Sequence, residues 1–233
     1  MKNKTLRILI SITAVIFPLV LLFKGIFGSF IFTFSIPILW QFGFSGKPVS
    51  SLSIKPDRVK ASVVIGVITG CILGFAGGGI LKSLGIAGYI FNDLHQLKLS
   101  LGPLNAAFSL QKELGYQLLA ISNSFAGLCV YLIFSIFMIG FGEEFFWRGF
   151  IQQKLSEHIS ANIAIWITAV LFSLIHFYIF TLLPIKAGTI FLLLIAIAGI
   201  AWGYLLKYFG NIWPSAISHG ITAFIIWKYF FFK

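Results

Sequence analysis

Seven apolar segments, each close to the length that crosses a lipid bilayer, constrain the fold of this chain more than any other feature. They lie at residues 7–25, 27–44, 61–81, 117–140, 161–183, 188–206 and 212–231. Because about 20 apolar residues in a helix span the hydrocarbon core, each segment is predicted to be a transmembrane helix. A helix satisfies its backbone hydrogen bonds within one segment, which a lone strand in lipid cannot do. The predicted fold is therefore an all-α, polytopic transmembrane helical bundle of about seven spans.

The scarcity of charge supports the same prediction. Hydrophobic residues make up 59% of the 233 residues and charged residues only 10%, whereas soluble domains are about 25% charged. A water-exposed surface cannot be built from so few charges, so membrane lipid is expected to cover much of the protein. The formal net charge of +11 does not indicate nucleic-acid binding, because the basic residues are scattered between apolar runs.

The basic residues instead predict an orientation. Ten of them fall on one side of the seven-span topology: Lys2, Lys4, Arg7, Lys47, Lys55, Arg58, Lys60, Arg148, Lys154 and Lys207. Cytoplasmic loops carry an excess of lysine and arginine, so this side and the N-terminus are predicted to be cytoplasmic.

The length of the chain favours a single membrane domain over residues 1–233, since domains commonly contain about 100–200 residues. Residues 1–115 hold the N-terminal spans and a connecting stretch, 82–115, without a functional motif. Pro103 could begin a short amphipathic helix in the membrane interface, or the stretch is an ordinary loop. Residues 116–233 contain the polar motifs and are predicted to form the catalytic helix bundle.

Glycines crowd the end of the third segment, at Gly70, Gly74, Gly77, Gly78 and Gly79. Small residues four apart let helices approach closely in lipid, so this segment is predicted to pack tightly against another helix. A phosphate-binding loop is the alternative, but it needs a strand before the glycines and a helix after them.

Acidic residues are rare enough for their positions to be informative. Only six occur, and two of them, Glu143 and Glu144, are adjacent near the end of the fourth segment. Ionisable residues at membrane depth are costly and usually functional. Glu144 and Arg148 are four residues apart and are expected to pair on one helix face. Glu143 points about 100° away and can act as a base toward water; the alternative is a salt-bridge cluster that ends the span.

Two of the four histidines lie within apolar segments. His176 follows Phe172 by four residues in the fifth segment, and His219 lies near the start of the seventh. Each histidine alone is more often a packing residue than a functional one. In straight, perpendicular helices the depths of Glu143, His176 and His219 would differ by more than about 10 Å, so tilted helices, a cavity or different helix boundaries are needed to bring them together.

Together these motifs resemble one known family, the CPBP intramembrane proteases, which include the type II CAAX prenyl endopeptidases and bacteriocin-processing relatives. The resemblance covers about residues 129–223. It is carried by Glu143-Glu144-x-x-x-Arg148, then Phe172-x-x-x-His176, then Trp213-Pro214 followed by His219. It implies a glutamic-type, metal-free intramembrane endopeptidase without a cofactor. Its substrate would be a membrane-associated peptide or protein, and its location a bacterial inner membrane.

The resemblance also implies roles for individual residues. Glu143 and His176 would polarise a water molecule, and His219 would stabilise the oxyanion of the tetrahedral intermediate. Glu144 and Arg148 would support these groups. No residue is assigned to a metal or a cofactor.

One position departs from the family pattern. The family usually has Asn or Asp four residues after its last histidine, where this chain has Ala223. Loss of one oxyanion donor slows such reactions by about 10²–10³-fold. Asn211 and Ser218 are other candidate donors, whereas Thr222 points about 100° away.

Three functions stay open. The chain is a glutamic endopeptidase, or a zinc peptidase that uses the same glutamate and histidines, or a catalytically impaired homologue that binds or regulates a membrane partner.

Overall fold

The computed structural model describes residues 36–38, 40, 52–55, 58–86, 120–181 and 183–231, and these ranges contain helices and turns but no strand. The elements are α3 (Val59–Ser83), α6 (Phe125–Phe134), η3 (Ser135–Phe141), α7 (Gly142–Glu144), η4 (Phe145–Gln152), α8 (Gln153–Ser156), α9 (Ala161–Leu174), η5 (Phe177–Thr181), α10 (Ile185–Phe209), α11 (Trp213–Ile226) and η6 (Trp227–Phe231). The predicted all-helical architecture is confirmed over these residues.

One helix runs without a break from Phe125 to Ser156 and contains the glutamate pair. Two π-helical segments, η3 and η4, flank α7, the short α-helical piece that carries both glutamates. The predicted end of this span at residue 140 is therefore wrong. The charged motif continues the helix because Glu144 and Arg148 are fully buried and paired with each other, so the helix need not end in water to accommodate them.

Three described helices are long and apolar enough to cross a bilayer, namely α3, the helix Phe125–Ser156 and α10, while the apolar helix α9 is shorter. The count of seven spans stays a prediction. The segment 7–25, nearly all of 27–44 and the stretch 87–115 with Pro103 lie outside the described residues.

The helix α9 ends at Leu174 rather than at residue 183, so His176 lies in the turn that follows the helix. The chain then reverses through the 3-10 segment η5. Pro184, which cannot donate a backbone hydrogen bond, precedes the first residue of α10.

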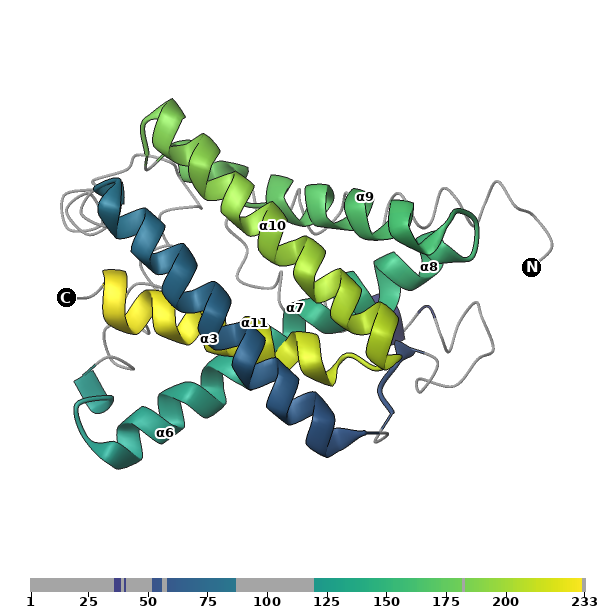
Figure 1. Ribbon diagram of the computed structural model, residues 1–233, viewed down its shortest axis with the longest axis horizontal. Helices are drawn as coiled ribbons and strands as arrows, with labels where there is room; N and C mark the ends of the chain where they lie inside the picture. Colours follow the sequence, from purple (N-terminus) through teal and green to yellow (C-terminus); the bar gives the residue numbers. More distant parts are fainter. Residues whose placement is uncertain are drawn as a thin grey trace.

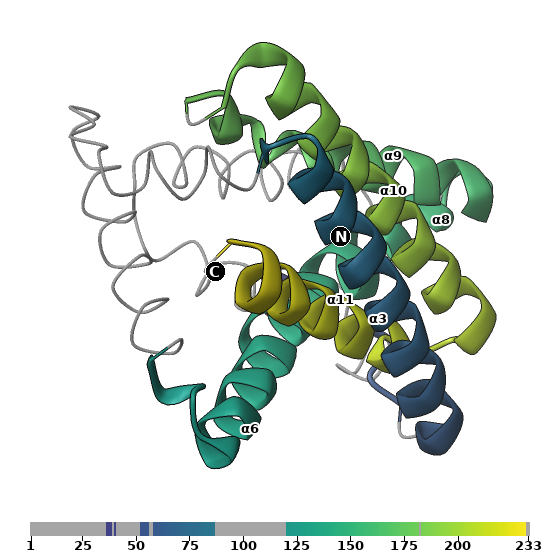
Figure 2. The same ribbon diagram turned by 60° about the vertical axis from the view of Figure 1, so that its left-hand side comes forward.

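The helix α11 lies in the middle of the described bundle. It packs against α3, η3, α7, α10 and α6. Figure 2 shows it between α6 and α3, with α10 on the far side of α3. Most of its side chains are buried. A polar residue on α11 is therefore surrounded by protein, which is where ionisable side chains in membrane proteins are tolerated.

The contact between α3 and α11 is built on glycine. The buried glycines of α3, one per turn, are Gly66, Gly70, Gly74 and Gly78. A Cβ atom on Gly70 would lie 2.8 Å from the carbonyl oxygen of Ser218, whereas one on Gly79 would meet no atom within 4 Å. Thr222 also donates to the carbonyl of Gly70 at 3.3 Å. The predicted tight packing of this segment is confirmed, with Gly79 outside the contact.

One end of the bundle gathers basic residues. Ile212 N donates to the carbonyl of Ser53 at 3.1 Å, which joins the segment 52–55 to the start of α11. Lys207 donates to Asn162 at 2.8 Å, which joins the end of α10 to the start of α9. The sequence groups Arg148 with this end, but Arg148 is buried among the helices instead.

Gly70→Ala is expected to destabilise the bundle, because the new Cβ would press on the Ser218 carbonyl, which cannot rotate away as a side chain could. Overpacking of this kind costs about 1–3 kcal/mol, so the midpoint of thermal unfolding in detergent should fall by several degrees. Gly79→Ala is the matched control, and its midpoint should stay unchanged or rise slightly, since alanine has the higher helix propensity. Equal midpoints for the two variants would contradict the assigned interface.

Candidate active site

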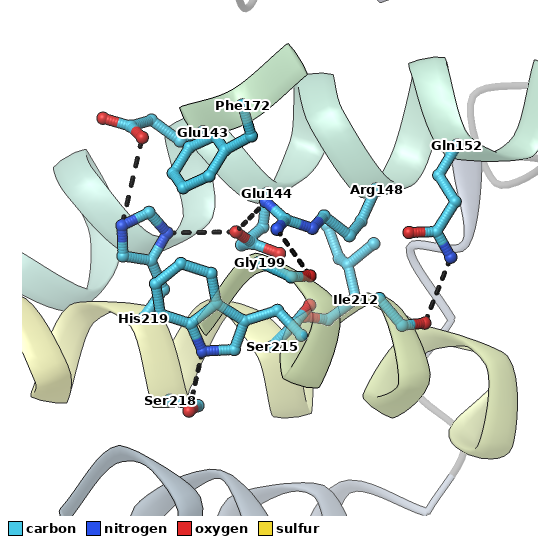
Figure 3. Close-up of polar contacts among 12 residues, drawn as sticks. Glu143, Glu144, Arg148, Gln152, Phe172, Gly199, Ile212, Ser215, Ser218 and His219 are labelled. Carbon is cyan, nitrogen blue, oxygen red and sulfur yellow. Dashed lines mark hydrogen bonds and ion pairs between the residues drawn. The ribbon is translucent and has the colours of Figure 1, made fainter. Parts of the chain in front are cut away.

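The carboxylate of Glu144 is the centre of a buried polar cluster (Figure 3). Its Oε1 atom accepts hydrogen bonds from Arg148 Nη1 at 2.7 Å and from His219 Nδ1 at 3.0 Å. Arg148 Nη2 donates to the carbonyl of Gly199 on α10 at 3.0 Å. The pair expected from the spacing of Glu144 and Arg148 is therefore present. Because both side chains are fully buried, the pair also joins α10 and α11 to the helix that carries the glutamates.

Glu143 lies on the other side of the His219 imidazole (Figure 3). Its Oε2 atom is 3.9 Å from His219 Nε2, which is beyond hydrogen-bond distance. This oxygen is buried without a hydrogen-bond partner among the described residues. The side chain of Glu143 is 18% exposed and that of Glu144 is 0% exposed. The two adjacent glutamates thus occupy different environments. Glu144 forms a buried salt bridge with Arg148, whereas Glu143 faces the His219 imidazole at 3.9 Å.

His176 is held by the backbone of the preceding turn. Its Nδ1 atom is 2.9 Å from the carbonyl oxygen of Phe172. A carbonyl oxygen only accepts, so we assign the proton to Nδ1, and in the neutral ring the lone pair is then on Nε2. The Phe172 ring contacts both imidazoles, with its centroid 5.1 Å from that of His176 and 5.7 Å from that of His219.

Glu143 and His219 therefore face each other, and His176 contacts the same Phe172 ring as His219. The depth mismatch expected from the sequence assumed that Glu143 ends its span, whereas Glu143 lies inside the helix Phe125–Ser156. The helices also cross at an angle instead of running parallel (Figure 1).

Glycines at two positions allow η3 and α11 to approach each other closely, and none of the sequence motifs includes them. A Cβ on Gly140 would overlap the carbonyl of Ala216, and one on Gly220 would overlap the backbone of η3. Ser135 Oγ donates to the carbonyl of Gly220 at 2.7 Å. The signal in the sequence is their position, since Gly140 lies one turn before the glutamates and Gly220 directly follows His219.

The candidate substitutes for the donor missing at Ala223 have other partners. Asn211 is fully buried and accepts from the backbone N–H of Trp213 at 3.1 Å. Thr222 donates to a carbonyl of α3. Ser218 accepts from an indole N–H at 2.9 Å. Asn211 and Thr222 thus contribute to helix packing. Across the described ranges, no group of three or more His, Cys, Asp or Glu side chains is arranged to hold a metal ion.

Arg148→Met is expected to destabilise the protein by about 3–5 kcal/mol, because it leaves the Glu144 carboxylate buried without its cationic partner. Lys154 provides the matched control, since it pairs with Glu157 at 2.8 Å while the two side chains are 19% and 44% exposed. Lys154→Met should change the stability by less than about 1 kcal/mol. Unfolding of both variants in the same detergent measures the difference, and similar small losses would mean that the Glu144–Arg148 pair does not hold the helices together.

Comparison with known families agrees with the motifs. Residues 125–225 match the family model described as type II CAAX prenyl endopeptidase Rce1-like, a range that includes both glutamates, Arg148 and the two histidines of the cluster. No curated protein and no solved structure matched the chain. The apolar helices support an integral membrane protein, and the family match supports a function of the CAAX-type intramembrane protease kind. Over residues 125–225, the chain is therefore similar to the CAAX protease-like family that its three motifs predict.

Proposed function

We propose that this protein is a glutamic-type intramembrane endopeptidase in which Glu143 and His176 activate a water molecule and His219 stabilises the oxyanion. The observation that carries the proposal is the position of the His219 imidazole between two carboxylates. Glu144 accepts from Nδ1 at 3.0 Å, and Glu143 is 3.9 Å from Nε2. One carboxylate can thus orient the imidazole while the other acts on water.

Water activation needs two acceptors that draw on the same molecule. A water molecule about 2.8 Å from Glu143 Oε2 would donate one hydrogen bond to that oxygen and one to the lone pair on His176 Nε2. As the water oxygen attacks the peptide carbonyl carbon, its proton passes to Glu143. When the C–N bond breaks, Glu143 returns this proton to the leaving amine and is a carboxylate again.

Oxyanion stabilisation requires His219 in its protonated form. The hydrogen on Nδ1 is directed to Glu144, so Nε2 needs a hydrogen of its own to donate to the developing negative charge. In this form the positive charge of the ring lies beside Glu143 and Glu144, and Arg148 is also part of the cluster. The two negative and two positive charges would compensate one another inside the bundle, which a buried site requires.

The substrate would be a membrane-associated peptide or protein whose cleaved bond reaches the helices of residues 116–233, the predicted catalytic part of a single membrane domain. The matching family model names a prenyl endopeptidase, so a prenylated C-terminus is a candidate. Lys55, Lys154 and Lys207 belong to segments joined at one end of the bundle. Because cytoplasmic loops carry an excess of basic residues, the proposal assigns this end and the N-terminus to the cytoplasmic side of a bacterial inner membrane.

Ala223 favours a second candidate function, that of a catalytically impaired homologue that binds or regulates a membrane protein. The family usually has an Asn or Asp donor at this position, and Asn211 and Thr222 are engaged in helix packing. Ala223→Asn distinguishes the two functions. If this variant cleaves a peptide that the natural protein does not, the natural protein is the impaired form.

Glu143→Gln and His176→Ala are each expected to lower peptide turnover by about 10²–10⁴-fold, the usual contribution of a general base. Turnover is measured on the purified protein in lipid, with a fluorogenic CAAX peptide in prenylated and unprenylated forms. Glu157→Gln is the matched control, since it makes the same change in an exposed acid and should retain full turnover. A chelator should have no effect, whereas a loss of activity restored by zinc supports the zinc alternative. Undiminished turnover in both active-site variants rules out the proposed mechanism.

A further inference from the structure

We infer that Trp202 is a positioning residue for His219, an inference that rests on the proposed peptidase function. The indole of Trp202 stacks on the imidazole, with ring centroids 4.0 Å apart and planes inclined by 17°. Trp202 is 3% exposed, so the stack is inside the protein. None of the three sequence motifs includes this residue.

Three contacts together define the orientation of the imidazole. Glu144 accepts a hydrogen bond from Nδ1, Trp202 covers one face of the ring, and the Phe172 ring lies edge-on at an interplanar angle of 87°. The nitrogen that remains, Nε2, is the one that faces Glu143. Without the indole, only the hydrogen bond to Glu144 and the edge of Phe172 would restrain rotation about the Cβ–Cγ bond, and the ring could tilt and shift Nε2.

Trp202 is itself fixed by the residue that precedes His219. Its Nε1 atom donates to Ser218 Oγ at 2.9 Å, and Ser218 is fully buried. A single side chain of α10 therefore contacts two successive residues of α11, with a hydrogen bond to the first and a ring stack on the second. This double contact determines both the position and the tilt of the indole.

The helix that carries the glutamates determines the position of Trp202 along α10. Arg148 Nη2 and Gln152 Nε2 donate to the carbonyls of Gly199 and Gly203 at 3.0 and 3.1 Å. These glycines lie three residues before Trp202 and one residue after it. Any Cβ on Gly203 would lie 2.7 Å from a side-chain atom of α9, so the close approach depends on glycine. These two hydrogen bonds therefore hold α10, and with it Trp202, against the helix that carries the glutamates.

The stack suits a ring that must hold a positive charge during the reaction. The face of an indole attracts cations, so the protonated imidazole of His219 would keep its place on Trp202 as negative charge develops on the substrate. Orientation of a reacting group affects the transition state more than it affects substrate binding. Loss of the indole should therefore lower kcat and leave KM nearly unchanged.

The test uses the full chain in lipid nanodiscs with a cleavable peptide. Trp202→Leu should lower kcat by about tenfold or more with KM within about twofold of the natural protein, while Trp202→Phe, which keeps an aromatic face, should recover most of the loss. Trp40 is the matched control, because it is also buried, at 6% exposed, and its ring packs on Phe150. Trp40→Leu should lower the unfolding midpoint and leave kcat per folded molecule unchanged. Equal effects of the two leucine variants on both quantities would overturn the inference.

A spectroscopic readout keeps the inference separate from the proposed function. Nitrogen-15 spectra of histidine-labelled protein, with His219→Gln to assign the signal, report the state of the ring nitrogens. The natural protein and Trp202→Phe should show one narrow pair of His219 signals, and Trp202→Leu a split or broadened pair. Unchanged signals in Trp202→Leu overturn the inference. If the signals change while Glu143→Gln retains full turnover, the proposed function fails and the positioning of His219 by Trp202 stands.

Discussion

The fold and the candidate site both depend on one buried carboxylate, that of Glu144. A single oxygen of this group accepts from Arg148 and from His219, and Arg148 continues to a carbonyl of α10. Removal of Arg148 would leave the Glu144 carboxylate buried without a compensating charge, which costs far more than the loss of a surface ion pair. Lipid provides little hydrophobic drive for helices to associate. The hydrogen bonds that link these three helices therefore contribute a large part of the free energy that holds them in one arrangement.

Small residues supply the complementary constraint, because a hydrogen bond of 3.0 Å between Glu144 and His219 requires their helices to lie unusually close together. Gly140 and Gly220 bring η3 and α11 to backbone contact on one side, and Gly70 does the same for α3 on the other. The helix α11 is thus held between two neighbours that leave it no room to shift. A displacement of α11 by one side chain's width would break the polar cluster.

The sequence predicted those features of the fold and the site that depend on residues close together in the chain. Apolar segments indicate helices, and four-residue spacing indicates the Glu144–Arg148 pair. Hydropathy misplaced the end of the fourth span because a charged motif looks like an interface, whereas burial and pairing carry the helix on to Ser156. The role of Trp202 could not be found locally, because its partners Ser218 and His219 belong to another helix. A tryptophan in an apolar segment is usually interpreted as a membrane-interface anchor.

The proposed chemistry also explains why two adjacent glutamates are needed. The carboxylate that orients His219 must stay an acceptor throughout the reaction, whereas the carboxylate that activates water must take up a proton midway. If one group did both, Nδ1 of the imidazole would lose its acceptor at the moment when Nε2 has to donate to the oxyanion. Glu144, whose charge is balanced by Arg148, can keep the first role while Glu143, with Oε2 unbonded among the described residues, takes the second. Neighbouring positions on one helix point these two carboxylates in different directions, so both reach His219 from opposite sides of the ring.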